Sequence, residues 1–153
     1  MARRRARELA FRTLFQAERG STPVLDVWRQ VREELAEEIE EEADDPYGDA
    51  LDREGIGFAE RLVTAYAEHA AEVDARLEAA VEGWTFGQMN QTDLNVLRLA
   101  TTEMLYEEEI PGKVTIEMAV RTAKKFGGEE SGRFVNGVLA RLYRDLGADR
   151  KGS

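Results

Sequence analysis

Residues 123–139 have the sequence AKKFGGEESGRFVNGVL, which predicts two helices joined by a glycine turn. Apolar residues recur at helical spacing before the turn, in a helix expected over residues 114–126. The pair Gly127-Gly128 supplies the positive φ with which a helix often ends. Ser131 is the expected N-cap of a second helix, which runs to Leu146 with its apolar residues on one arc. The end of the chain is therefore predicted to be a helical hairpin.

Phe134 lies just off the apolar arc of the second helix, beside Arg133 and a short step from Lys124 and Lys125. Two interpretations fit a large ring at the edge of a basic hairpin. The ring is either a residue at the rim of the core, which is where burial habits place it, or a platform on which an unpaired base stacks. The residue pattern leaves both interpretations open.

Charge is unevenly distributed along the chain. The formal net charge is −10 at pH 7, yet residues 33–54 alone contain 12 acidic residues and one arginine. The rest of the chain contains 19 acidic and 20 basic residues and is close to neutral. We expect the acidic insertion at 33–54 to be solvated and mobile, the usual state of a dense charge run. The alternative is that it masks a basic surface elsewhere on the protein.

That basic surface is predicted at the first helix, where residues 3–12 read RRRARELAFR, with five arginines and one glutamate. Small and apolar residues from Ala6 to Ala17 predict one buried face, whereas Arg4, Phe11 and Phe15 are expected on an outer stripe. Cations in a first turn oppose the helix dipole, and a phosphate backbone would compensate them. A solvated, frayed basic end is the alternative.

Between these two regions the periodicity predicts four further helices, for a total of seven helices and no strand. The third and fourth meet at a changed angle near residue 70. The stripe of the fourth is expected to reach Trp84, which Gly83 and Gly87 bracket in a turn. Trp28 is expected in the core. Asn90 is the expected N-cap of the next helix, with Asp93 three residues later as in a capping box.

Several classes of function are excluded by what the sequence lacks. There is no cysteine and a single histidine, His69, so thiolate chemistry and histidine-rich metal sites have no basis. No phosphate-binding glycine loop follows a strand pattern, and no carboxylate pair has a catalytic setting. We therefore expect no enzyme, no catalytic residue, no metal and no cofactor. Without an apolar span or a secretory signal, a cytoplasmic protein away from the membrane is expected.

Four motifs, in this order along the chain, resemble the NusB family of bacterial transcription antitermination factors. They are RRRARELA (residues 3–10), VLRLATTEML (96–105), PGKVTIEMAVRTAKKFGG (111–128) and RFVNGVL (133–139). The resemblance covers nearly the whole chain outside residues 33–56. It departs from the family at Glu117-Met118, where Asn-Glu is usual, and in the length of the acidic insertion.

The resemblance implies an all-α fold of about seven helices in two roughly perpendicular small bundles. It implies one domain over residues 1–147, with the acidic insertion inside it and a tail at 148–153. The implied function is a non-enzymatic adaptor that binds the single-stranded boxA element of ribosomal RNA leader transcripts. Such adaptors act together with NusE, a small-subunit ribosomal protein, in the antitermination complex of RNA polymerase.

Carried over by position, the resemblance implies RNA-binding residues in the first helix and in the terminal hairpin. They are Arg3, Arg4, Arg5, Arg7, Glu130, Arg133 and Phe134. It places the contact with NusE at Phe15 and Asp93.

Two other functions compete with the RNA-binding adaptor. One is a helical protein–protein scaffold or dimer that buries Phe11 and Phe15 and does not bind RNA. The other is a piece of a ribosomal RNA cytosine methyltransferase, some of which carry a NusB-like domain. This chain contains neither a nucleotide-binding segment nor a catalytic cysteine, so it does not carry out methylation by itself.

Overall fold

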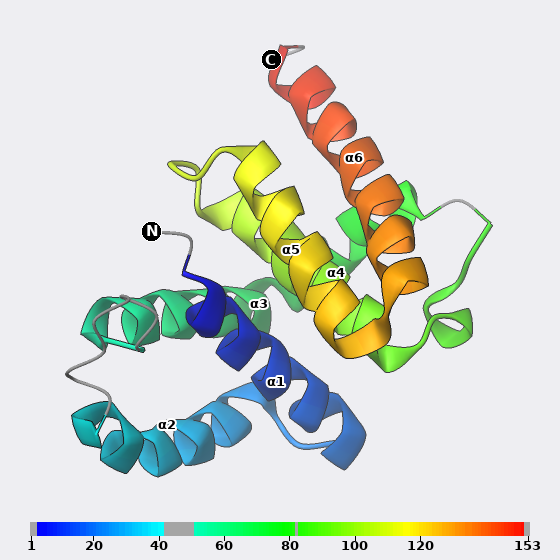
Figure 1. Ribbon diagram of the computed structural model, residues 1–153. Coiled ribbons are helices and arrows are strands. Elements are labelled where there is room, and N and C mark those ends of the chain that lie inside the picture. The colour runs from blue at the N-terminus through cyan, green and yellow to red at the C-terminus, as the bar shows by residue number, and fades with distance from the viewer. Residues whose placement is uncertain (1–2, 42–50, 82, 152–153) are drawn as a thin grey trace. The chain divides into compact units, whose positions relative to one another are not determined.

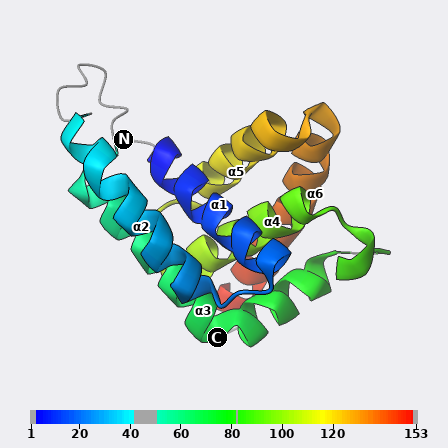
Figure 2. The same ribbon diagram turned by 90° about the horizontal axis from the view of Figure 1, so that it is seen from below.

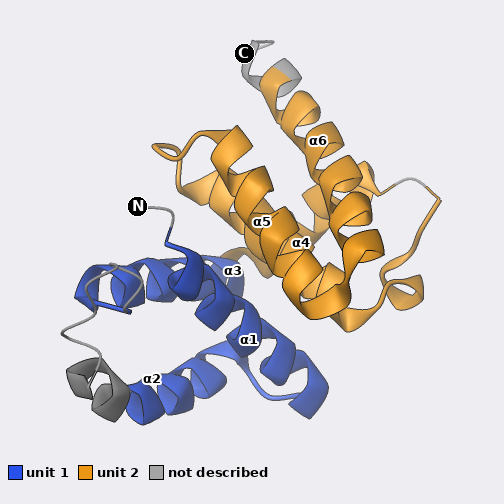
Figure 3. Ribbon diagram, viewed as in Figure 1, with its two compact units in different colours: residues 1–68 blue, residues 69–153 orange. Residues whose placement is uncertain are grey.

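The computed structural model describes residues 3–41, 51–81 and 83–151, and in this part of the chain it contains helices and no strand. The elements in chain order are six α-helices, labelled in Figure 1, and one 3-10 turn: α1 (Arg4–Gly20), α2 (Val24–Glu41), α3 (Arg53–Ala80), η1 (Phe86–Gln88), α4 (Gln91–Tyr106), α5 (Gly112–Gly127) and α6 (Glu129–Lys151). The predicted all-α class is confirmed. The chain divides into two compact units, unit 1 (residues 1–68) and unit 2 (residues 69–153) (Figure 3). None of the helices in the described residues has the length and hydrophobicity that a membrane span requires.

The third and fourth predicted helices are one helix with a break. Within α3 only His69 has a non-helical backbone, with φ −122° and ψ 25°. Its ring stacks on Tyr106 of α4 with 4.5 Å between the ring centroids, and the Tyr106 hydroxyl donates to Glu72 at 2.9 Å. The predicted change of angle is therefore real, and it accounts for the difference between seven expected helices and six observed ones.

In unit 1, α1 packs against α2, which follows it after a short turn (Figures 1 and 2). The expected face of α1 from Ala6 to Ala17 is buried. Phe11 was expected on an outer stripe, and this prediction is wrong because the ring is only 3 % exposed. Arg7, Phe11 and Leu14 follow each other at i, i+4 and i+7, so α1 buries a second stripe beside the first. Trp28 is in the core as expected, and its indole N–H donates to Glu60 at 3.3 Å.

In unit 2, α5 and α6 form the predicted hairpin, and both pack on α4 (Figure 1). Gly128 has the expected positive φ, 92°, at the turn. The expected N-cap role of Ser131 is wrong, because α6 already begins at Glu129 and the Ser131 hydroxyl donates back to the Gly127 carbonyl at 3.2 Å. A side chain at Gly127 would collide with Ser131, so this close turn requires glycine.

The segment between α3 and α4 contains the turn that its glycines predict. Helix α3 ends at Ala80, and the predicted turn follows it, with Gly83 at φ 76°. Trp84 is consequently 50 % exposed. The next helix begins as expected, because the Asn90 side chain accepts a hydrogen bond from the Asp93 backbone N–H at 2.8 Å.

The acidic insertion is partly built into unit 1. Helix α2 continues through Glu41, and residues 42–50 lie outside the described part of the chain. Beyond them, Leu51 is buried, and Asp52 caps α3 by accepting from the Gly55 backbone N–H at 2.8 Å. The last four residues of the insertion therefore contribute to the fold. The expected mobility of the remainder stays a prediction, as does the single-domain boundary at residue 147.

Candidate nucleic-acid interface

The arginines at the start of α1 are held in place by contacts within unit 1. Arg3 is the N-cap residue of α1 and has a left-handed backbone, φ 55°. Its guanidinium pairs with Glu54 at 2.9 Å and lies 4.5 Å from the centre of the Phe58 ring. Arg4 pairs with Glu8 one turn later at 3.3 Å, and its side chain is 38 % exposed.

Phe58 organises this cluster. It is fully buried, and its ring also lies 5.1 Å from the guanidinium carbon of Arg7 and 5.5 Å from that of Arg61. Contacts of this kind contribute about 0.5–1 kcal/mol at exposed sites and about 2 kcal/mol when water is excluded. We name Arg3, Arg4, Arg5 and Arg7 with Phe58 the arginine cluster. Two of its cations, Arg3 and Arg7, are pre-ordered by an aromatic ring that the sequence pattern did not single out.

The members of the arginine cluster differ in access to solvent. Arg3, Arg4 and Arg5 are half-buried, whereas Arg7 is only 5 % exposed. The first turn of α1 contains no acidic residue, and no side chain caps its backbone N–H groups. The turn thus presents cations and helix-end N–H groups together, which is a favourable setting for an anion. Arg3, Arg4 and Arg5 are its accessible cations, whereas Arg7 is buried against Phe58.

The second group of predicted residues occupies the first turns of α6. Glu130 and Arg133 are exposed, and Phe134 is half-buried. The Phe134 ring lies 5.6 Å from the Trp84 ring, with 64° between the ring planes. Phe134 is thus at the rim of unit 2 with part of its ring open to solvent. Glu130, Arg133 and Phe134 belong to unit 2, whereas the arginine cluster belongs to unit 1.

The two predicted partner-binding residues have different settings. Phe15 of unit 1 is half-buried, with Phe11 at 5.8 Å on one side and the Arg19 guanidinium carbon 5.7 Å from its ring. Asp93 of unit 2 is 7 % exposed. Its Oδ2 accepts a bond from the Asn90 amide at 3.3 Å, whereas its Oδ1 is buried and has no hydrogen-bond partner among the described residues. A buried oxygen without a donor costs about 1–3 kcal/mol.

The departure at Glu117-Met118 has a simple structural outcome. Glu117 is exposed on α5 and pairs with Arg121 one turn later at 2.9 Å. Met118 is 4 % exposed and belongs to the core of unit 2. A methionine therefore packs where a polar residue is usual, and no polar contact is available from that position.

Three residues that lie near the predicted sites were not predicted from the sequence pattern. Glu54 and Phe58 contact Arg3 from a helix about fifty residues away, and no local pattern indicates such a contact. Trp84 could have been found, because it lies between Gly83 and Gly87 in a stretch that the turn residues already mark as a loop. Among the described residues, no group of His, Asp and Glu side chains could hold a metal ion.

Comparison with known proteins gives a consistent result. The family model described as "NusB family" matches residues 4–144. The transcription antitermination protein NusB of Thermus thermophilus is 51% identical over 146 residues, which is 95% of this chain and 93% of that protein.

Among solved structures, T. maritima NusB is 33% identical, with a TM-score of 0.75 over 93% of this chain and 90% of that chain. A crystal structure of the antitermination factors NusB and NusE in complex with dsRNA has a TM-score of 0.75 at 23% identity. It covers 94% of this chain and 97% of the matched one, and at this identity it supports the fold alone.

Proposed function

The chain belongs to the NusB family, and from this premise we propose that it is a non-enzymatic RNA-binding adaptor in transcription antitermination. It binds single-stranded boxA-type RNA of ribosomal RNA leader transcripts together with NusE, within the RNA polymerase antitermination complex in the cytoplasm. The observation that carries the proposal is the arginine cluster, in which Phe58 and Glu54 hold cations at the open first turn of α1.

Pre-ordering explains why the arginine cluster suits a phosphate backbone. A free arginine loses up to about 2 kcal/mol of side-chain entropy when it is fixed. The contacts of Arg3 with Phe58 and Glu54, and of Arg4 with Glu8, reduce this loss because the side chains are already restricted. Guanidinium groups also bind phosphate oxygens through two parallel hydrogen bonds. Arg3, Arg4 and Arg5 would therefore contact phosphates, with Arg7 supporting them from below.

The start of α6 supplies chemistry of a different kind. Phe134 would stack on an unpaired base, Arg133 would contact a phosphate, and Glu130 would accept a hydrogen bond from a base amino group or a ribose hydroxyl. The half-buried ring of Phe134 supports this role, since its inner part is fixed by the unit and its outer part is open. A single strand with splayed bases matches such a site better than a duplex does.

NusE would contact Phe15 and Asp93. Half-buried aromatic rings with a fixed rotamer are common anchors of interfaces, and Phe15 is fixed between Phe11 and Arg19. Asp93 would turn its carboxylate outward toward a cationic group of NusE, which would give the unpartnered Oδ1 a donor. The rival dimer, which would bury Phe11 and Phe15, is less favoured because Phe11 is already buried within the chain and only Phe15 is partly open.

A binding measurement with matched variants tests the proposal. Fluorescence anisotropy of a labelled single-stranded boxA RNA, with and without NusE, gives the affinity of the wild type. Arg4→Ala with Arg5→Ala should weaken binding roughly tenfold or more, since each hydrogen bond to a charged group contributes about 1.5–3 kcal/mol. The control is Arg29→Ala with Arg32→Ala, which removes the same charge from exposed positions of α2.

The two double variants separate a site from a general charge effect. The proposal predicts that the α2 variant binds RNA within about twofold of the wild type. Exposed ion pairs contribute little to the free energy of unfolding, so the α2 variant should also remain folded. Equal weakening by both variants, or no binding of boxA RNA by the wild type with NusE present, would overturn the proposal.

A further inference from the structure

Trp84 is the most exposed large aromatic residue of the described chain, and no role has been assigned to it. Half of its surface is open to solvent, in contrast to Trp28, which is 4 % exposed. Tryptophan offers a larger rigid apolar ring to a partner than any other side chain does, and a base is one partner that stacks on such a ring. Its one ring contact given by the structure is with Phe134, edge to face at 5.6 Å.

The segment that carries Trp84 is fixed rather than loosely attached. Gly83 turns the chain with φ 76°, and the Thr85 backbone N–H donates to the Gln88 side chain at 2.9 Å. Phe86 lies against the guanidinium carbon of Arg98, 5.4 Å from its ring centre.

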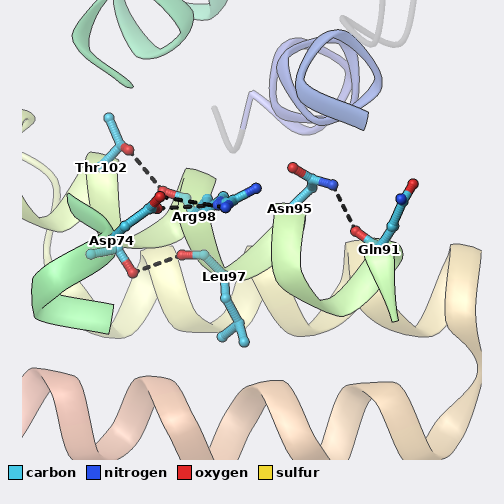
Figure 4. Close-up of polar contacts among 7 residues, drawn as sticks. Asp74, Gln91, Asn95, Leu97, Arg98 and Thr102 are labelled. Carbon is cyan, nitrogen blue, oxygen red and sulfur yellow. Dashed lines mark hydrogen bonds and ion pairs between the residues drawn. The ribbon is translucent and has the colours of Figure 1, made fainter. Parts of the chain in front are cut away.

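Arg98 is itself held by Asp74. Its Nε donates to one carboxylate oxygen at 3.1 Å and its Nη2 to the other at 3.4 Å (Figure 4). These contacts hold the backbone two residues after Trp84, and the Trp84 ring itself lies against Phe134.

We propose that Trp84 is a second base-stacking ring of the RNA site, which with Phe134 takes two unpaired bases turned away from each other. The inference rests on the proposed function, because Phe134 belongs to the RNA surface proposed there. The angle between the rings decides the kind of RNA. Successive bases of a duplex are nearly parallel, whereas bases stacked on two rings inclined by 64° are not. The pair of rings therefore selects a single strand with splayed bases.

The charge around the rings agrees with this occupant. Arg133 precedes Phe134 and is exposed, and the stem of Lys124 crosses the start of α6 so closely that Gly132 has no room for a side chain. Aromatic rings beside cations are the usual components of a single-strand site, in which stacking and phosphate contacts act together.

Affinity measurements on three variants test the proposal. Trp84→Ala should weaken binding of single-stranded boxA RNA by roughly 5- to 100-fold, the range expected for the loss of one stacked base. Trp84→Phe, which keeps a stacking ring, should restore the affinity to within about threefold of the wild type. For the same RNA annealed to its complement, Trp84→Ala should leave the affinity unchanged. Circular dichroism and the thermal midpoint verify that each variant is folded.

The fluorescence of Trp84 provides a second, independent readout. The chain contains two tryptophans, so Trp28→Phe leaves Trp84 as the sole emitter, and stacking on a base should quench it as RNA is added. If Trp28→Phe fails to fold, the difference between wild-type and Trp84→Phe emission reports the same signal. The titration is repeated with NusE alone.

The outcomes distinguish this inference from the proposed function. RNA binding by the wild type without quenching, together with unchanged affinity of Trp84→Ala, overturns the role of Trp84 and leaves the adaptor function standing. Quenching by NusE and not by RNA also overturns it, since Trp84 would then belong to a protein interface. Absence of RNA binding by the wild type overturns the proposed function itself.

Discussion

Gly137 offers a test in which stability and RNA binding should change in opposite directions. It lies on α6 three residues after Phe134, so the two share a face of the helix. A Cβ added at Gly137 would meet no atom within 4 Å, and its backbone does not have a positive φ. Gly137→Ala should therefore stabilise unit 2 by about 0.5–1 kcal/mol, the usual cost of glycine inside a helix. For a chain of this length the thermal midpoint should rise by roughly 1–4 °C.

The same methyl group would stand beside the proposed stacking site. If RNA approaches the backbone of α6 next to Phe134, Gly137→Ala should lower the affinity several-fold while the protein becomes more stable. Gly147→Ala is the matched control, because Gly147 is also in α6 and a Cβ there likewise meets nothing within 4 Å. Both variants are followed by thermal melting and by anisotropy with single-stranded RNA. Equal RNA affinities of the two variants would refute the approach of RNA to this face. A lower melting temperature of Gly137→Ala would contradict the statement that an added Cβ meets no atom there.

Three further changes probe other parts of the account. Deletion of residues 42–50 should leave the denaturation midpoint nearly unchanged and, if the insertion masks the arginine cluster, should tighten RNA binding at low salt. Phe15→Ala and Asp93→Asn should each weaken NusE binding in calorimetry without unfolding the protein, and unchanged affinity in both would remove this placement of the interface. Burial, followed by the hydrogen bond and the charge of Glu72, raises the pKa of Tyr106, so the folded state favours the neutral phenol. The stability that the neutral phenol contributes is complete below the unfolded pKa of about 10 and is lost as the pH rises toward the folded pKa. Tyr106→Phe should therefore flatten the fall in the free energy of unfolding above about pH 10.

The sequence pattern predicts local features of this fold well. Helical spacing identified the apolar arc of α6, and the side-chain chemistry of Asn90 identified the start of α4. Both depend on residues within a few positions of each other. The extra helix in the prediction arose at His69, where a break in the backbone shifts the phase of the apolar pattern without ending the helix.

Features that depend on distant parts of the chain were not predictable in the same way. The burial of Phe11 depends on a second stripe of α1 finding a partner surface, which one helix cannot show. The pre-ordering of Arg3 depends on Phe58 and Glu54, and the helix start at Asp52 lies in a stretch that composition alone describes as solvated. The arginines themselves were evident from the sequence, whereas the contacts that hold them required the structure.

The salt dependence of RNA affinity separates phosphate contacts of the arginine cluster from base stacking on Phe134. The measurement is a titration of single-stranded boxA RNA, at salt concentrations from about 50 to 300 mM, against the wild type, Arg4→Ala with Arg5→Ala, and Phe134→Ala. Each lost phosphate contact should reduce the slope of log affinity against log salt by about 0.7, so the arginine variant should show a flatter line. Phe134→Ala should lower the affinity by a similar factor at every salt concentration, because stacking carries no counterion release. Parallel lines for the wild type and the arginine variant would contradict the claim that the arginine cluster binds phosphates, and wild-type affinity of Phe134→Ala would contradict the stacking site.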